Sequence, residues 1–295
     1  MATSNPFLRL KARTLFLVLF LINLIFGLFI VVLASLGILP LAPEDPALAP
    51  VLYMLIFSSL CLWVIWRCRY LHIYQRYLVG TIPQGFPWAK TVVLIGAALV
   101  FSLGAFQISY YLLSFIAPSL VKSILQEDLL LSTQDTSAPL LYRGLMLFTI
   151  LVVAPITEEF LFRGILIHRW GTKWGIQPAI VFSSVLFGIL HTNLLGLSVF
   201  GLVMALLYLK TRTLLVPIIC HALNNLVATA LEFLTTLTDS IETIDTLAEF
   251  QANWWMGFIC VAISSPFVIS FIYQNWPRPE ARLPYFANSG TTQVL

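Results

Sequence analysis

Charge is the property that this sequence lacks most. Only 10% of its 295 residues are charged, whereas soluble domains carry about 25% charged residues. Hydrophobic residues make up 59% of the chain, and the mean hydropathy is +0.93. A soluble globule must cover its surface with polar groups, so this composition excludes a water-soluble core.

Cysteines and basic clusters are also scarce. Four cysteines in 295 residues exclude a disulfide-rich secreted scaffold, while 22 Phe and 8 Trp exclude an intrinsically disordered chain. The net charge is only +3, and Lys and Arg do not cluster on a polar face. We therefore expect no nucleic-acid partner. The remaining class is an integral membrane protein that crosses the bilayer several times.

Eight stretches are long and apolar enough to be candidate membrane spans, since a spanning helix needs about 20 mostly apolar residues. The first stretch, at about 26 residues, exceeds the 7–15-residue core of a signal peptide, so we expect it to be retained. The fold class is therefore all-α, with about eight transmembrane helices. The stretches are Thr14–Leu39, Ala49–Trp66, Ala89–Ala117, Leu140–Leu166, Ile176–His191, Leu194–Thr211, Leu214–Leu234 and Trp254–Tyr273.

The basic residues predict the orientation of these spans. Of the 16 Lys and Arg residues, only Lys122 and Arg143 fall in the segments on one side of the membrane, and Arg163 lies within a span. The other 13 fall on the opposite side, which the positive-inside rule identifies as cytoplasmic. Both termini are then cytoplasmic, which requires an even number of spans. The membrane is the inner or plasma membrane of a bacterial cell, or the endoplasmic reticulum of a eukaryotic one.

The chain is predicted to form one integral membrane domain over residues 1–295. Its catalytic core covers about residues 140–235, and a flexible C-terminal tail covers about 277–295, where the sequence becomes polar after Pro277. Membrane lipid is one expected partner. The sequence does not indicate the oligomeric state.

Two adjacent carboxylates interrupt the fourth span. An ionisable side chain at bilayer depth costs about 2.5–3.5 kcal/mol on insertion scales, so Glu158 and Glu159 need a reason to be there. Neighbouring side chains on a helix point about 100° apart. Glu159 precedes Arg163 by four residues, a spacing at which side chains meet. This pair can neutralise itself and leaves Glu158 free for another task.

Histidines interrupt two further spans. Phe187 and His191 share a helix face near the end of the fifth stretch, and His221 and Asn225 share a face in the seventh. Each histidine alone is more often a hydrogen-bonded core residue than a catalyst. Buried polar groups need partners, and inside a membrane these groups are one another's most available partners.

This set of side chains suits hydrolysis of an amide bond. A poorly solvated carboxylate is a suitable general base, so Glu158 can take a proton from water. His191 can share that water or pass the proton to the leaving amine. His221 and Asn225 can donate hydrogen bonds to the developing oxyanion. No Ser or Cys is paired with a base in a way that predicts a covalent intermediate.

The motifs EExxxR (Glu158, Glu159, Arg163), FxxxH (Phe187, His191) and HxxxN (His221, Asn225) together resemble those of the CPBP family. This family comprises the CAAX prenyl endopeptidases and the bacteriocin-processing and immunity proteins. The resemblance implies an eight-span all-helical fold and a glutamate-dependent intramembrane endopeptidase. It also implies that Glu158 activates water with His191, that Glu159 and Arg163 support the site, and that His221 and Asn225 hold the oxyanion. No cofactor is implied.

Two other functions remain open. Glu158, His191 and His221 are ligand types that a catalytic zinc ion uses, although the HExxH pattern is absent. Alternatively, the polar cluster only fixes helix packing in a non-catalytic immunity or scaffold protein. A proton-coupled transporter is a third and more distant reading.

The substrate is also open. A groove between apolar spans suits either a prenylated CAAX-type protein or an unmodified transmembrane peptide. The predicted span ends leave one inconsistency, because Glu158 lies about eight residues from the inner end of its span and His191 some fifteen residues into the next. At ~1.5 Å per residue, this places the histidine about 10 Å further out than the glutamate.

Overall fold

The computed structural model describes residues 5–38, 41–42, 44–126, 133, 136–238 and 246–290. Within these residues the secondary structure is helical throughout, without strands, which confirms the all-α class. Seven helical segments are long and apolar enough to cross a membrane, so the chain is a multi-pass integral membrane protein. They are α2 (Ala12–Ser35), α3 (Leu48–Tyr70), α5 (Trp88–Ser114), the continuous segment Pro139–Trp174, α11 (Leu194–Thr211), α12 (Leu215–Thr238) and α14 (Trp254–Asn275).

The fifth predicted stretch differs from the other seven. Its helix, α10 (Ile176–Ile189), has only 14 residues and a length of about 21 Å, whereas the hydrocarbon core is about 30 Å thick. It follows α9 after a reversal at Gly175, whose φ of 89° favours a residue without a side chain. α10 packs against α9 and α11. It therefore forms a short arm of a helical hairpin inside the bundle rather than a full span.

The segment Pro139–Trp174 is one long helix with two widened turns. It runs through α7 (Pro139–Phe148), α8 (Ala154–Glu159) and α9 (Ile167–Trp174), which are joined by π-helical stretches at Thr149–Val153 and Phe160–Leu166. The helix continues eight residues beyond its predicted end at Leu166. Counted from the turn at Gly175, Glu158 and His191 then lie at similar distances along their helices, which removes the predicted depth difference.

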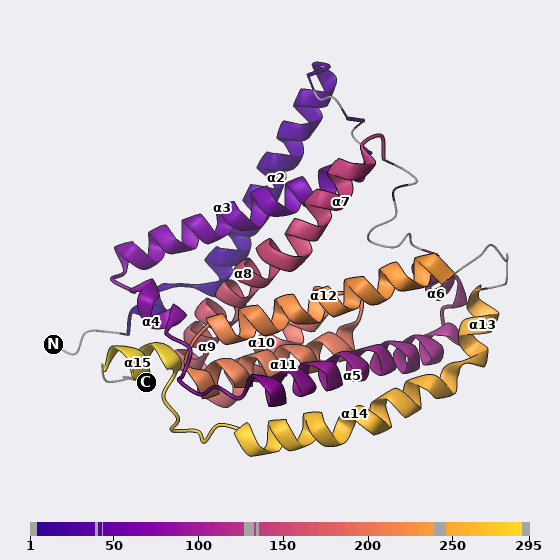
Figure 1. Cartoon of the computed structure of the whole chain (residues 1–295). Coiled ribbons are helices and arrows are strands. Elements are labelled where there is room, and N and C mark those ends of the chain that lie inside the picture. The colour runs from indigo at the N-terminus through magenta and orange to yellow at the C-terminus, as the bar shows by residue number, and fades with distance from the viewer. Residues whose placement is uncertain are drawn as a thin grey trace.

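The long helices fall into two groups (Figure 1). α5, α11, α12 and α14 run side by side, with α5 packed against both α11 and α14. α2, α3 and α7 form the second group and diverge from the first at the end away from the termini. α2 packs mainly on α3 and is the least buried of the spans, as expected of a helix that faces lipid.

Both described ends of the chain lie at one end of the molecule (Figure 1). The two described ends share a side because α10, although too short to span the membrane, reverses the direction of the chain once more. That this end faces the cytoplasm stays a prediction from the basic residues.

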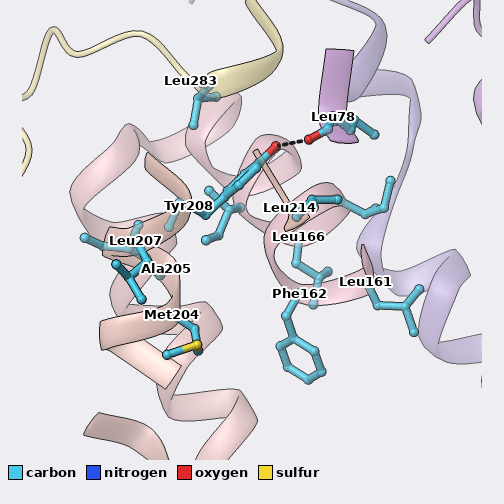
Figure 2. Close-up of a cluster of buried hydrophobic side chains, with 14 of the residues drawn as sticks. Leu78, Leu161, Phe162, Leu166, Met204, Ala205, Leu207, Tyr208, Leu214 and Leu283 are labelled. Carbon is cyan, nitrogen blue, oxygen red and sulfur yellow. Dashed lines mark hydrogen bonds between the residues drawn. The ribbon is translucent and has the colours of Figure 1, made fainter. Parts of the chain in front are cut away.

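A compact apolar core fills the same end of the molecule. Figure 2 shows part of it, where the phenol of Tyr208 donates a hydrogen bond to the Leu78 carbonyl at 3.4 Å. This core also contains Leu78 of α4 (Gln75–Val79) and Leu283, Tyr285 and Phe286 of the C-terminal segment. The labelled side chains are Leu78, Leu161, Phe162, Leu166, Met204, Ala205, Leu207, Tyr208, Leu214 and Leu283.

The stretch that the sequence predicts as a C-terminal tail contains a packed helix. Helix α15 (Pro284–Ser289) buries Tyr285 and Phe286 against the bundle. The Tyr285 backbone N–H donates to Nε2 of His168 at 3.1 Å, and Phe7 of α1 (Pro6–Arg9) stacks on the same imidazole at 5.0 Å. Aromatic burial therefore outweighs the polar composition of the segment. Residues 291–295 of the predicted tail lie outside the described residues.

Candidate active site

The two glutamates lie on α8, between the π-helical stretches. π-Helical turns are rare, and they widen and re-aim the helix locally, frequently at functional sites. In the first stretch, the carbonyl of Ile150 accepts a hydrogen bond from Asn225 Nδ2 of α12 at 2.9 Å. An amide from another helix is therefore bound to a backbone carbonyl seven residues before Thr157. These turns were not predicted, because no residue pattern in the stretch marks them.

Glu159 forms the buried ion pair that the i, i+4 spacing predicts. Arg163 Nη1 donates to Glu159 Oε1 at 2.9 Å, and its Nη2 donates to the Gly201 carbonyl of α11, also at 2.9 Å. Both side chains are almost fully buried. The guanidinium also lies over the Phe187 ring at 4.8 Å. Arg163 thus connects the glutamate helix to α10 and α11.

His221 lies between the two glutamates. Its Nδ1 is 2.9 Å from Glu159 Oε1, and its Nε2 is 3.9 Å from Glu158 Oε2. A carboxylate only accepts hydrogen bonds, so Nδ1 carries a proton when it binds Glu159. Glu159 therefore orients the imidazole, and Nε2 becomes a second donor when both ring nitrogens carry a proton.

Glu158 has a different environment from its neighbour. Its Oε1 accepts a hydrogen bond of 2.6 Å from the phenol of Tyr53 on α3, while its buried Oε2 has no hydrogen-bond partner within the described part of the chain. Phe57 stacks on Tyr53 at 4.3 Å and fixes the phenol ring. The sequence analysis missed Tyr53, because nothing in the apolar α3 stretch signals a contact over 105 residues.

His191 comes directly after α10, and its ring is held by its own helix. Nδ1 is 2.6 Å from the Phe187 carbonyl oxygen, which can only accept, so Nδ1 is the donor. In the neutral imidazole, Nε2 is then free to accept a hydrogen bond or a proton. The predicted FxxxH spacing thus has two effects here, since Phe187 supplies this carbonyl and its ring packs on both His191 and His221.

One cavity of about 450 Å³ brings these groups together. Glu158, His191, His221 and Asn225 line it, whereas Glu159 and Arg163 lie behind its wall. Tyr53 and Asn224 contribute further polar atoms. The rest of the lining is mainly apolar, with side chains from α3, α7, α11 and α12 that include Pro50, Met146, Ile150, Leu197, Phe200 and Ala228. A cavity of this size and lining suits a ligand with an apolar body and a few polar groups.

The cavity residues do not form a convergent metal site. Among the described residues, no group of three or more His, Cys, Asp or Glu side chains is placed to hold a metal ion. Of the three ligands expected for zinc, only His221 and Glu158 are in contact, with Nε2 3.9 Å from Oε2.

Comparison with known proteins gives a match over the helices that build this cavity. Residues 139–227 match the family described as type II CAAX prenyl endopeptidase Rce1-like. This match supports the resemblance of the three motifs to the CPBP family. All six site residues predicted from the three motifs lie inside the matched segment. The match starts at α7 and ends within α12, so the matched segment also contains the π-helical stretches and the α10–α11 hairpin.

Two bacterial proteins are similar to this chain. It is 37% identical over 84 residues to the Bacillus subtilis (strain 168) protein named "Putative membrane peptidase YdiL", which covers 28% of this chain and 34% of that protein. It is 29% identical over 181 residues to an "Uncharacterized 24.3 kDa protein" of Escherichia coli, over 57% of this chain and 76% of that protein. The alignment thus spans about a third of the Bacillus protein. No solved structure is significantly similar to this chain.

Proposed function

We propose that this protein is an intramembrane endopeptidase in which Glu158 activates a water molecule for attack on a peptide carbonyl. The observation that carries the proposal is the environment of Glu158. One of its oxygens is bound to Tyr53, and the other has no hydrogen-bond partner within the described part of the chain and lies 3.9 Å from His221 Nε2. A buried carboxylate that lines a mainly apolar cavity is a suitable general base. Similarity to a CAAX prenyl endopeptidase family and to a named membrane peptidase supports the same activity.

The proposed reaction uses water and no covalent enzyme intermediate. Glu158 takes one proton as the water oxygen forms a bond with the carbonyl carbon. The resulting oxyanion accepts hydrogen bonds from Nε2 of the protonated His221 and from the second N–H of the Asn225 amide. The carbon–nitrogen bond then breaks, and the proton reaches the leaving amine through Nε2 of His191. Each positioned oxyanion donor contributes about 2.7–4 kcal/mol in well-studied hydrolases.

The proposed substrate is a membrane-associated protein whose scissile bond enters this cavity. Its mainly apolar lining suits a prenyl chain, as in a CAAX-type substrate, and equally an unmodified transmembrane peptide. The similar proteins come from bacteria, which favours the bacterial plasma membrane as the location. We propose that the reaction needs no metal, since the mechanism uses only side chains of this chain.

The test is cleavage of a quenched, farnesylated CAAX peptide by the purified protein in detergent, alongside the same peptide without the farnesyl group. We expect Glu158→Gln to lower the rate by about 10²–10⁴-fold, the usual contribution of a general base. Glu249→Gln is the matched control, because Glu249 is exposed on α13 (Thr246–Ala252), away from the cavity.

Three outcomes separate the alternatives. Cleavage that is lost in Glu158→Gln and survives a chelator supports the glutamate mechanism. Cleavage that a chelator abolishes and zinc restores contradicts it in favour of a metalloprotease. If the folded wild-type protein cleaves neither peptide, CAAX-type activity is wrong for this chain. Membrane proteins that bind the Glu158→Gln variant would then be captured and incubated with wild-type protein. Cleavage of a captured protein supports another peptidase function, and binding without cleavage supports a scaffold function.

A further inference from the structure

A second cavity, of about 290 Å³, lies where the start of α2 meets the end of α9. The helix ends that line it lie at the end of the molecule that carries the termini (Figure 1), and its lining shares no residue with that of the candidate active site. Its lining combines basic side chains with two tryptophans. The lining residues are Lys11, Ala12, Arg13, Arg169, Trp170, Lys173 and Trp174.

The lining carries four positive charges and no carboxylate. Within the described residues, none of the four cations forms an ion pair with Asp or Glu. The Arg169 guanidinium is the most constrained of them, since its Nε and Nη1 are buried and have no hydrogen-bond partner in the described part of the chain. The Arg169 side chain as a whole is partly exposed, and an anion in the cavity would pair with these two buried donors.

The backbone of α2 adds to the positive potential of this cavity. The 24-residue helix begins at Ala12, inside the cavity lining, and no side chain caps its first turn. A helix N-terminus carries a partial positive charge and free N–H groups, which favour phosphate and other anions.

The cavity also lies at the depth of lipid head groups. It sits at the ends of two membrane-crossing helices, where tryptophans mark the interface between hydrocarbon and water. Trp170 stacks on Trp174 at 6.0 Å, and Lys173 lies over the Trp174 ring at 5.0 Å. One turn further into the membrane, α2 exposes Phe16 and Leu17, against which an acyl chain can lie.

We propose that this cavity binds the phosphate of an anionic phospholipid. Arg169 and Lys173 from α9 contact the phosphate from one side, and Lys11 and Arg13 from the start of α2 contact it from the other. The bound lipid holds the N-terminal span against α9 and stabilises the folded protein in an anionic bilayer. This site does not depend on the proposed peptidase activity.

The test measures lipid binding to the full-length, delipidated protein by native mass spectrometry and by thermal unfolding in detergent. The probes are phosphatidylglycerol, zwitterionic phosphatidylcholine and inorganic phosphate. Wild-type protein is expected to bind phosphatidylglycerol in preference to phosphatidylcholine and to melt at a higher temperature with it. Replacing two cations, as in Arg169→Gln/Lys173→Gln, is expected to weaken phosphatidylglycerol binding roughly 30-fold.

Two further variants make the result decisive. Lys11→Gln/Arg13→Gln removes two exposed cations on the other side of the cavity and should weaken binding similarly. It tests the proposal even if the first variant does not fold. Arg278→Gln/Arg282→Gln removes the same charge from exposed positions outside the cavity and should bind like wild type. The proposal is overturned if the control weakens binding as much as the cavity variants do. It is also overturned if phosphatidylcholine or inorganic phosphate stabilises the protein as well as phosphatidylglycerol does.

Discussion

Glu158 and Glu159 are neighbours in sequence but have different electrostatic environments. Glu159 is paired with both Arg163 and His221 and does not line the cavity. Glu158 accepts a hydrogen bond from the Tyr53 phenol at one oxygen, and its side chain lines the cavity. A general base must reach the proton that it removes, so the geometry favours Glu158 for this role and Glu159 for positioning His221.

The phenol of Tyr53 is expected to matter for activity more than for stability. Tyr53→Phe keeps the ring and its stacking on Phe57 but removes the 2.6 Å hydrogen bond to Glu158. Because hydrogen bonds to charged groups contribute about 1.5–3 kcal/mol, we expect cleavage to fall at least tenfold. Tyr70→Phe, at an exposed position on the same helix, is the matched control in the peptide assay. Equal rates for Tyr53→Phe and wild type would contradict a role in orienting the carboxylate.

Breaking the buried ion pair is expected to destabilise the fold. Glu159→Gln leaves Arg163 and His221 without their anionic partner, which costs about 3–5 kcal/mol for a buried pair. Removing both charges in Glu159→Gln/Arg163→Met should destabilise the protein less than the sum of the two single changes, because no uncompensated charge then remains. Thermal unfolding in detergent measures all three variants. Strictly additive losses would show that the two charges act independently.

At the level of helices, the α10–α11 hairpin positions His191 and lets Arg163 reach across to Gly201. Close contact between its arms depends on glycine. An added methyl group at Gly188 would overlap the Leu194 carbonyl oxygen and Ser198 Oγ. The two arms would have to separate to make room for it.

Gly188→Ala is therefore expected to lower both thermal stability and cleavage. Gly96→Ala is the control, since Gly96 lies within α5 and has open space where its methyl group would go. Alanine favours a helix by about 1 kcal/mol over glycine, so this variant should be as stable as wild type or more so. If both variants behave alike, close packing of the hairpin is not required.

The two π-helical stretches of the helix that carries Glu158 and Glu159 also shape the site at the level of helices. They lie on both sides of α8, and the first offers a backbone carbonyl to Asn225. This contact attaches α12, which carries His221, to the helix that carries both glutamates. One N–H of the Asn225 amide is thereby committed to structure, which leaves the other for a substrate.

At the level of the whole molecule, the cavity lies between two groups of helices, and a loop contact joins α3 and α7 within one of these groups. Asp45, just before α3, accepts hydrogen bonds from the Thr136 hydroxyl at 2.7 Å and from the Ser137 hydroxyl and backbone N–H, just before α7. It also accepts one from the Ala47 backbone N–H. α3 and α7 both contribute to the cavity wall, so this contact joins two parts of that wall.

These donors, the Ala47 N–H foremost and then Thr136 and Ser137, hold the pKa of Asp45 well below its usual range. A carboxyl whose pKa is lowered by folding stabilises the folded state above its unfolded pKa of about 3.9 and loses this effect as the pH falls through the lower folded value. Asp45→Asn should therefore unfold at a lower temperature than wild type at pH 7. The difference should shrink progressively below about pH 4.

Unfolding temperatures measured from pH 7 down to pH 3 test this prediction. Glu44→Gln, at the exposed neighbouring position, should follow wild type at every pH. A difference between Asp45→Asn and wild type that stays constant with pH would show that ionisation of Asp45 does not stabilise the fold.

The sequence by itself determined the class of protein and the approximate positions of seven of its long apolar helices. Scarce charge and long apolar stretches leave a membrane as the only solvent in which this chain can fold, and helices satisfy every backbone group there. The ion pair of Glu159 with Arg163 also follows from sequence, because a spacing of four residues is a local property of a helix. The three motifs pointed to the family in the same way.

Tertiary structure alone decided which of these groups meet. Neither the Tyr53 contact with Glu158 nor the position of His221 between the two glutamates has a local signal, since each joins helices far apart in the chain. The short α10, the wide turns and the docked C-terminal helix also depend on packing, which overrides helical period and polar composition. A site built from several helices is set by how those helices pack, and spacing along one chain segment does not contain that information.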